Sequence, residues 1–273
     1  YPEGLKSDDY LRLAAEAAEE IIDKGPYSFA ADYGELFREP DADKNEFILA
    51  IRMDQAISCV HNSTAYACMA TQGNPGFSKK FIDSFLMSDG SRFTDKEGWE
   101  TMQFADEVKD RDPRLAAIIR MPDQVRTTDK YSIVGPDLSV TSSGFQMDKY
   151  VMDGSLYPTA ERVDMSFNDI PVYRFAEAHL IYAEAKAELG QFRQDEADKS
   201  INKLRARVNM PKMVVEDLTV DPYLVSEKYG YRTLAEKNPS NLAALLEIRR
   251  ERTIELVLED SNRWDDIVRW KEG

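Results

Sequence analysis

The sequence predicts a mainly α-helical protein with tetratricopeptide-like helical hairpins, a loop-rich insertion and a few short strands. Apolar residues recur at helical spacing near both ends of the chain. The middle, about residues 54–169, is instead divided by Gly, Pro, Asn and Ser into short pieces. The 273 residues suffice for one large domain or two small ones. We therefore expect a single domain, with a helical scaffold from residues 1–30 and 170–273 and a ligand-binding region in the loops.

The first helix is predicted over residues 7–24, where apolar side chains form one stripe. Ser7 is expected to cap its N-terminus, and Gly25 is expected to end it as a left-handed cap. Residues 46–53 predict a short buried strand. Within the loop-rich region, residues 78–87 and 114–119 predict short helices.

Helical periodicity returns after the loop-rich region. Residues 174–189, ended by Gly190, and residues 195–209 predict two antiparallel helices of about the size of a tetratricopeptide unit. A third helix is expected over residues 240–259, with an inward stripe. That stripe consists of Leu242, Leu245, Leu246, Ile254, Val257 and Leu258. In the terminal piece, we expect Trp264 and Trp270 to be packing anchors.

Composition excludes several classes of protein. The net charge of −15 and the pI near 4.7 argue against a nucleic-acid partner, because such a chain repels a phosphate backbone. No apolar run reaches the length of about 20 residues that a membrane helix needs. Cys59 and Cys68 are too few for a disulfide framework. We expect two buried free thiols, with a local disulfide as the alternative in an oxidising compartment.

The sequence lacks the usual signatures of catalysis and of cofactor binding. It contains no phosphate-binding glycine loop and no G-x-S-x-G elbow. Residues 41–45 begin like a calcium loop, but Glu46 and Arg52 occupy positions that need Gly and Glu. Cys59, His61 and Cys68 supply three zinc ligands without an evident fourth. We therefore expect no catalytic residue, no metal and no cofactor.

Two further sets of polar residues have structural interpretations. Arg250, Glu251, Arg252 and Glu255 lie at helical spacing, and we expect them to pair with each other and with a neighbouring helix. His179 lies in an apolar helix, where we expect a core residue with one satisfied ring nitrogen.

Sugar binding needs flat aromatic faces with amides and carboxylates at their edges. The loop at residues 58–77 and its neighbours offer such groups. The alternative is that Tyr66 covers the core while the polar residues only solvate a loop. The candidate ligand-binding residues are His61, Asn62, Tyr66, Gln72, Asn74, Trp99 and Tyr157.

The last hundred residues contain several distinctive short strings. They are DIPVYRFAE (169–177), YAEA (182–185), INKLRAR (201–207) and the spaced set RER…EL…E…RW…D…RW within 250–270. Upstream strings agree, among them RDPR at 111–114. In this order the strings resemble the SusD/RagB family of nutrient-binding outer-membrane lipoproteins of Bacteroidetes.

The resemblance implies a protein without chemistry, which captures a glycan or other nutrient and delivers it to a SusC-like TonB-dependent transporter. It also implies a surface-exposed location at the outer membrane, with a lipid anchor on an N-terminal region absent from this chain. Family members are much longer, so the chain looks like an interior and C-terminal portion. The alternatives are a helical-repeat scaffold that binds a peptide and, less favoured, a glycoside hydrolase.

Overall fold

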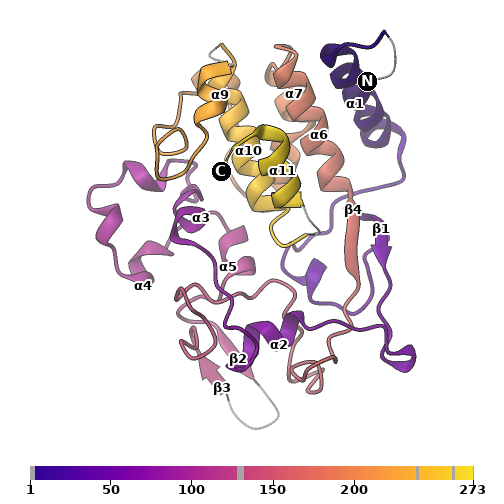
Figure 1. The fold of residues 1–273 in the computed structure, drawn as a ribbon, viewed down its shortest axis with the longest axis vertical. Coiled ribbons are helices and arrows are strands. Elements are labelled where there is room, and N and C mark those ends of the chain that lie inside the picture. Colours follow the sequence, from indigo (N-terminus) through magenta and orange to yellow (C-terminus); the bar gives the residue numbers. More distant parts are fainter. Residues whose placement is uncertain (1–3, 128–131, 238–239, 260–261, 273) are drawn as a thin grey trace. The chain divides into compact units, whose positions relative to one another are not determined.

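The structure is a computed structural model that describes residues 4–127, 132–237, 240–259 and 262–272 (Figure 1). Its contacts divide the chain into two compact units. The expectation of a single domain stays a prediction. The helical unit consists of Tyr1–Ala30, Lys44–Ile48 and Tyr173–Gly273, and the loop-rich unit of Ala31–Asp43 and Leu49–Val172.

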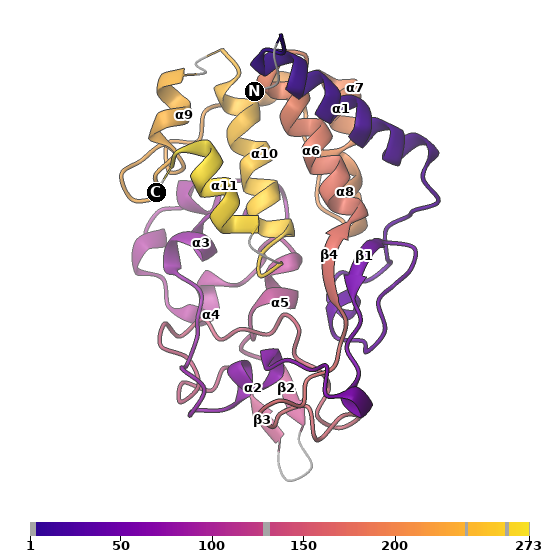
Figure 2. The ribbon, with the colours of Figure 1, turned by 45° about the vertical axis from the view of Figure 1, so that its right-hand side comes forward.

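The helical unit is built around a long central helix, α6. This helix lies between α1 and α10 and packs against both (Figure 2). The mainly helical fold class with a few short strands is confirmed. The elements of this unit are α1 (Ser7–Lys24), α6 (Phe175–Glu188), α7 (Gln194–Lys199), α8 (Ile201–Arg207), a 3-10 turn (Val215–Asp217), α9 (Arg232–Lys237), α10 (Leu242–Glu255) and α11 (Asn262–Trp270).

Helix α1 has the predicted bounds, but both predicted caps are wrong. The N-cap is Lys6, whose backbone N–H donates to Oδ2 of Asp9 at 2.9 Å, and Ser7 is already helical. Gly25 has an extended backbone with φ of −66°. A glycine fits there for another reason, because an added Cβ would lie 2.5 Å from the Ile21 carbonyl oxygen.

The predicted hairpin is confirmed in its first helix and modified in its second. Gly190 follows α6 with φ of +69°, the left-handed conformation that glycine tolerates best. The expected helix at 195–209 is divided into α7 and α8 at Ser200. The Ser200 hydroxyl donates to the Glu196 carbonyl oxygen at 2.6 Å, a local bond that competes with regular helix geometry.

The last predicted helix is shorter than expected. Two of its predicted inward residues, Val257 and Leu258, are not buried. Because α10 ends at Glu255, Leu258 leaves the helical stripe, adopts φ of +61° and is 44% exposed. Trp270 is a packing anchor, as predicted. Trp264 is not, since it is 70% exposed. A six-residue separation places the two rings far apart around the axis of α11.

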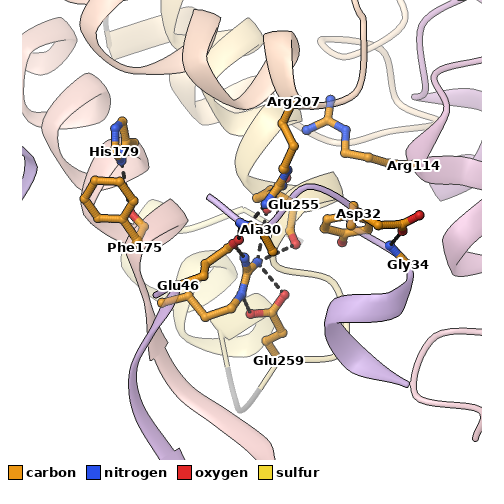
Figure 3. A network of polar contacts seen from close by, with 12 residues as sticks. Ala30, Asp32, Gly34, Glu46, Arg114, Phe175, His179, Arg207, Glu255 and Glu259 are labelled. Carbon is orange, nitrogen blue, oxygen red and sulfur yellow. Dashed lines mark hydrogen bonds and ion pairs between the residues drawn. The ribbon is translucent and has the colours of Figure 1, made fainter. Parts of the chain in front are cut away.

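A buried arginine lies at the centre of the helical unit. Arg174 donates to Glu46 at 2.5 Å, to Glu255 at 3.1 Å and to Glu259 at 2.6 Å. Arg207 joins the same group through Glu46 at 2.9 Å and Glu255 at 2.5 Å (Figure 3). These carboxylates come from distant parts of the sequence, so the group links the chain at residue 46 to α8 and α10.

The predicted structural pairing along α10 is confirmed. Glu251 accepts from Arg205 at 2.6 Å, and Arg252 donates to Asp266 at 2.8 Å. Arg250 pairs with Asp221 and, at 3.2 Å, with Glu247. Glu255 is held by Arg174 and Arg207. These contacts join α10 to other segments of the same unit.

His179 is a core residue with one satisfied ring nitrogen, as predicted. It is buried in α6, and its Nδ1 lies 3.0 Å from the Phe175 carbonyl oxygen (Figure 3). Burial lowers the pKa of His179 to about 4, because the imidazolium form would lose its hydration. His179 is therefore neutral at pH 7.

The loop-rich unit contains short elements separated by irregular chain. The helices predicted at 78–87 and 114–119 occur in shorter form, as α3 and α5. In the hairpin, β2 and β3 are antiparallel, with Val125 opposite Val134. The elements are α2 (Ser63–Cys68), α3 (Lys79–Asp83), α4 (Phe104–Glu107), α5 (Arg114–Ile118), β2 (Val125–Thr127), β3 (Ser132–Val134) and 3-10 turns at Glu35–Phe37, Gln55–Ile57, Phe93–Asp95 and Trp99–Thr101.

Two strands carry the chain between the units. The strand predicted at 46–53 is present as β1 (Phe47–Ile51), but the prediction that it is buried is wrong, since Leu49 and Ile51 are exposed. It pairs with β4 (Ile170–Arg174), which we did not predict as a strand. Both strands contain a boundary between the units.

Side-chain bonds to backbone groups connect the irregular segments of the loop-rich unit. The Gln146 side chain donates to the Ala67 carbonyl oxygen at 2.8 Å and accepts from the Asp137 N–H at 2.7 Å. Arg111 donates to the carbonyl oxygens of Glu107, Ile82 and Phe85, at 2.7, 2.7 and 2.9 Å. These bonds satisfy backbone groups that a helix or sheet would otherwise pair.

Candidate ligand-binding site

The loop-rich unit contains a pocket with a volume of about 310 Å³. Three separate segments of the unit form its wall, and polar side chains predominate. The lining residues are Glu35, Arg38, Glu39, Arg120, Gln124, Val125, Arg126, Thr127, Asp148, Val151, Met152, Asp153, Gly154, Ser155, Leu156 and Tyr157.

A carboxylate between two guanidinium groups fixes one side of the pocket. Arg38 donates to Oδ2 of Asp148 at 2.5 Å, and Arg120 donates to Oδ1 of the same residue at 2.7 Å. Arg38 also pairs with Glu35 at 3.3 Å. These charge-assisted bonds hold the side chains in place and leave the pocket's cations already neutralised.

The β2–β3 hairpin supplies a second side of the pocket. Arg126 of β2 pairs with Glu161 at 2.5 Å. Just before β2, the Gln124 side chain accepts from the Met121 N–H and donates to the Ala116 carbonyl oxygen, both at 2.9 Å. This wall is therefore tied to the end of α5.

The third side is a tight turn that presents Tyr157. Asp153 accepts from the N–H and the hydroxyl of Ser155, at 2.8 and 2.6 Å. The hydroxyl bond from Ser155 lowers the pKa of Asp153. A Cβ on Gly154 would lie 2.8 Å from Glu161 Oε1 and 3.0 Å from the Thr127 carbonyl oxygen, so a larger residue here would displace the Glu161 side chain and crowd the backbone of β2. Two more contacts hold Tyr157, whose N–H donates to the Asp153 carbonyl oxygen at 2.7 Å and whose ring meets Phe167 edge to face at 5.5 Å.

Tyr157 is the predicted ligand-binding residue that this pocket includes. His61 and Asn62 instead lie where the chain at 61–62 meets the chain at 164–168. The His61 Nε2 is 2.9 Å from the Asn168 carbonyl oxygen, and Asn62 donates to Asp164 at 2.7 Å. Burial lowers the pKa of His61, so its ring is neutral at pH 7.

The other four predicted residues lie at separate places in the loop-rich unit. Tyr66 projects from α2 and is 46% exposed. Gln72 is half-buried, and the Asn74 backbone carbonyl accepts from the Ser142 N–H at 2.9 Å. Trp99 meets Phe93 edge to face at 6.1 Å. The role of these residues in ligand binding stays a prediction.

The cysteines are free, as predicted, but both residues are half-buried and not buried as expected. Burial raises the pKa of the Cys68 thiol to about 12. Within the described ranges, no three or more His, Cys, Asp and Glu side chains come together as a metal site. Across the same ranges, no helix combines the length and the apolar character needed to cross a membrane.

Our sequence interpretation missed the charged residues of the pocket, chiefly Arg38, Arg120 and Asp148. One feature of the sequence could have identified these residues. Arg120 and Asp148 lie in a loop-rich region, where a charged side chain has no helical neighbour three or four residues away to pair with. Such residues need partners that are distant in the sequence, and here they meet at the pocket.

The chain was compared with known families and proteins. It matches the model of the SusD family over residues 45–273. No curated protein gives a significant sequence match. A SusD-like carbohydrate-binding protein from Bacteroides fragilis is 25% identical, with a TM-score of 0.65 and coverage of 97% of this chain and 49% of that chain.

Two further solved structures have the same fold. A second SusD-like protein from Bacteroides fragilis is 21% identical, with a TM-score of 0.66 and coverage of 97% of this chain and 51% of that chain. A structure with a xylogluco-oligosaccharide is 16% identical, with a TM-score of 0.59 and coverage of 98% and 47%. The chain thus spans about half the length of these structures. Because the family match extends over most of its residues, the chain belongs to the SusD family.

Proposed function

We propose that this protein binds a glycan without transforming it, and that the pocket around Tyr157 is a glycan contact. Membership of the SusD family supports the class of function. The names of two similar structures, a carbohydrate-binding protein and a complex with a xylogluco-oligosaccharide, support the class of ligand. The observation that carries the location is a rigidly held aromatic ring beside fixed hydrogen-bonding groups in one pocket.

The charges of the pocket favour a neutral oligosaccharide. Arg38 and Arg120 already share Asp148, and Arg126 already has Glu161. An acidic sugar would have to compete with these carboxylates, whereas sugar hydroxyls can add to them as further donors and acceptors. The Tyr157 ring offers an apolar face to the C–H side of a pyranose.

The pocket is poorly suited to glycoside hydrolysis. A general acid in such an enzyme needs a raised pKa, so that it holds its proton at neutral pH. The pKa of Asp153 is instead lowered, because its carboxylate accepts a hydrogen bond from the Ser155 hydroxyl. Both carboxylate oxygens of Asp148 already accept hydrogen bonds from guanidinium groups, one from Arg38 and one from Arg120. These environments favour binding over proton transfer.

We further propose that the bound glycan is delivered to a SusC-like TonB-dependent transporter at the outer membrane of a Bacteroidetes cell. In this proposal the whole protein is lipid-anchored and exposed at the cell surface. The support for this step is the family alone. Copurification of the tagged, full-length protein with a SusC-like barrel from detergent-solubilised membranes would support the step. A full-length protein found only in the soluble fraction would contradict it.

The binding proposal is tested by calorimetric titration with xylogluco-, manno- and malto-oligosaccharides. We expect Tyr157→Ala to weaken binding of the preferred glycan by about tenfold, or about 1.4 kcal/mol, because the variant loses the apolar ring face that contacts the sugar. Tyr66→Ala is the matched control, because Tyr66 is an exposed tyrosine of the same unit outside the pocket. A loss with Tyr66→Ala instead would move the site to the loop first predicted from the sequence.

A reducing-sugar assay on the same samples separates binding from turnover. We expect no product release above the rate without protein. Release that disappears on changing Asp148 or Asp153 to Asn would establish a hydrolase and contradict the proposal. Binding of none of these glycans, together with capture of a peptide ligand, would favour the helical-repeat scaffold.

A further inference from the structure

A second pocket lies within the helical unit, and the proposed function does not use it. Its volume is about 500 Å³, and it lies among α1, α6, α10 and α11. Figure 2 shows these four helices side by side in the helical unit. The lining residues are Ser7, Leu11, Ala14, Ile181, Glu184, Ala185, Glu188, Arg249, Arg252, Arg269, Trp270 and Lys271.

The lining of this pocket is basic, although the chain as a whole carries a net charge of −15. It contains four cations and two carboxylates. One of the carboxylates is fully engaged. Glu184 accepts from both terminal nitrogens of Arg269, each at 2.7 Å, and from Nε1 of Trp270 at 2.6 Å. These bonds lower the pKa of Glu184 despite its burial. Little of its charge is left for the other cations.

Arg249 is the least satisfied of these cations. It is only 4% exposed, and its Nε and Nη1 have no hydrogen-bond acceptor in the described part of the chain. Its nearest carboxylates are long contacts, 3.8 Å to Glu188 and 3.7 Å to Glu272. Glu272 already accepts from the N–H groups of Thr233 and Leu234. The guanidinium carbon lies 4.3 Å from the ring centre of Trp270, a contact that supplies no acceptor for these N–H groups.

Arg252 also has a guanidinium nitrogen without an acceptor, although its other nitrogens are better paired than those of Arg249. Its Nε donates to both carboxylate oxygens of Asp266 at 2.8 Å, and its Nη2 is 3.4 Å from Glu177. Its Nη1 has no acceptor among the described residues, and the side chain is 5% exposed. A buried charged donor without an acceptor costs free energy that a bound anion would recover. Two such arginines line the same pocket.

The remaining wall of the pocket is apolar. Leu11 and Ala14 of α1 face Ile181 and Ala185 of α6 across their packed surfaces. A ligand that matches both walls therefore joins an anionic group to an apolar group. A planar carboxylate fits the fork of a guanidinium, and a branched aliphatic side chain fits the wall of leucine, isoleucine and alanines.

We propose that this pocket binds a carboxylate that is joined to a branched apolar group. Arg249 is the main anion-binding residue, Arg252 is a second donor, and α1 and α6 hold the apolar part. The site is independent of the glycan pocket, because every residue that lines it belongs to the helical unit.

The test uses the intact chain and a matched pair of small probes, N-acetylleucine and N-acetylleucinamide, which differ in the negative charge. Trp270 lines the pocket, so its indole N–H signal reports binding in a protein with ¹⁵N-labelled tryptophan. Trp99 and Trp264 serve as internal references outside the pocket. We expect N-acetylleucine to shift the Trp270 signal to saturation and the amide to bind at least about tenfold more weakly.

Variants locate the anion-binding group. We expect Arg249→Gln to weaken N-acetylleucine binding about tenfold and Arg249→Lys to weaken it less, because lysine retains the charge without the fork. Arg12→Gln is the control, since it changes an exposed arginine of α1 that does not line the pocket. If Arg249→Gln fails to fold, the comparison of the two probes on the unchanged chain decides.

Three outcomes would overturn the proposal. The first is equal binding of acid and amide, which shows that the charge is not recognised. The second is tighter binding of inorganic phosphate or acetate than of N-acetylleucine, which shows that the apolar group adds nothing. The third is the absence of any Trp270 shift at millimolar probe. Glycan binding is expected to be unchanged in Arg249→Gln, so a failure here leaves the proposed function standing.

Discussion

The two units of this chain differ in the bonds that most often satisfy their buried polar groups. In the helical unit, charged side chains cross-link elements by binding one another, as Arg174 does with Glu46, Glu255 and Glu259. The loop-rich unit also contains ion pairs, such as that of Asp148 with Arg38 and Arg120, but there polar side chains cross-link segments by binding backbone groups as well. Gln146 bonds to groups 79 and 9 residues away.

The difference follows from what each unit leaves unpaired. A helix satisfies its own backbone N–H and C=O groups, so its buried side chains must find side-chain partners. Irregular chain leaves backbone groups without partners, and buried amides or guanidinium groups must supply them. Arg111, with three backbone carbonyl oxygens as acceptors, is the charged example in the loop-rich unit. We therefore expect the helical unit to depend on charge and the loop-rich unit on hydrogen-bond geometry.

The largest effect is expected at the centre of the helical unit. Arg174→Met retains most of the volume but removes a shared cation from three buried carboxylates, of which Glu46 and Glu255 keep Arg207 as a partner. Removing one partner of a buried ion pair costs about 3–5 kcal/mol of the free energy of unfolding. Urea unfolding followed by circular dichroism measures this loss. Arg174→Lys, which retains the charge, should lose less. A loss below 1 kcal/mol for Arg174→Met would show that this group does not hold the helical unit together.

The helical unit should also respond to acid through His179. Its pKa in the folded protein, about 4, lies below the usual value of 6.5, so the unfolded chain binds the proton more readily. Stability should therefore be fully present above pH 6.5 and fall by roughly 3 kcal/mol as the pH falls to 4.

The measurement for His179 is the difference in unfolding free energy between the unchanged chain and His179→Gln, taken from pH 7.5 to 4. A glutamine amide can still donate to the Phe175 carbonyl oxygen, and it does not titrate. Subtraction removes the contribution of the carboxylates. A difference that stays constant across this range would mean that the imidazole is accessible to water.

The stability of the loop-rich unit should depend on the hydrogen bonds that the Gln146 amide makes to backbone groups. Gln146→Leu leaves the Ala67 carbonyl oxygen and the Asp137 N–H without side-chain partners, at a cost of about 1–3 kcal/mol. Faster amide hydrogen exchange at Asp137, read by mass spectrometry on short peptides, should accompany the loss. Gln146→Glu keeps the acceptor for the Asp137 N–H and should protect that amide better than Gln146→Leu. Equal exchange in the two variants would contradict the assigned bond.

The smallest effect is expected for an ion pair at the surface of the helical unit. Lys199 of α7 lies 2.8 Å from Glu19 and 2.9 Å from Asp23 of α1, and all three side chains are partly exposed. Solvent screens such contacts, so Lys199→Ala should cost about 0.5 kcal/mol at low salt and less in 0.5 M NaCl. If Lys199→Ala lost several kcal/mol of unfolding free energy at both salt concentrations, this exposed ion pair would contribute as much as a buried one, which would contradict the prediction.

Local patterns predicted the helices well and their ends poorly. The apolar stripe over 7–24 gave the bounds of α1, and the burial of His179 followed from its apolar neighbours. The caps of α1 were wrong, because Ser7 and Gly25 were judged by residue type. Pro26 follows Gly25, and a residue before proline favours the extended conformation that Gly25 adopts. The exposure of Trp264 depended on where α11 begins, which a short apolar pattern does not specify.

The pocket was only partly foreseeable. Tyr157 was among the predicted ligand-binding residues, since an aromatic residue in a loop is a candidate by type alone. Arg38 and Asp148 were not, because the two are 110 residues apart and no spacing rule relates them. Strand β4 was missed for a similar reason, since its partner β1 lies more than a hundred residues away.

By itself, the sequence determined the mainly helical class, the bounds of the most periodic helices and the resemblance to the SusD family, because these depend on residues close together in the chain. Only the tertiary structure decided which carboxylates surround Arg174, which side chains meet around Tyr157, and which arginines are left without acceptors. The reason is physical. A helical hydrogen bond joins residues four positions apart, whereas a buried charge pairs with whatever partner the completed fold brings within reach.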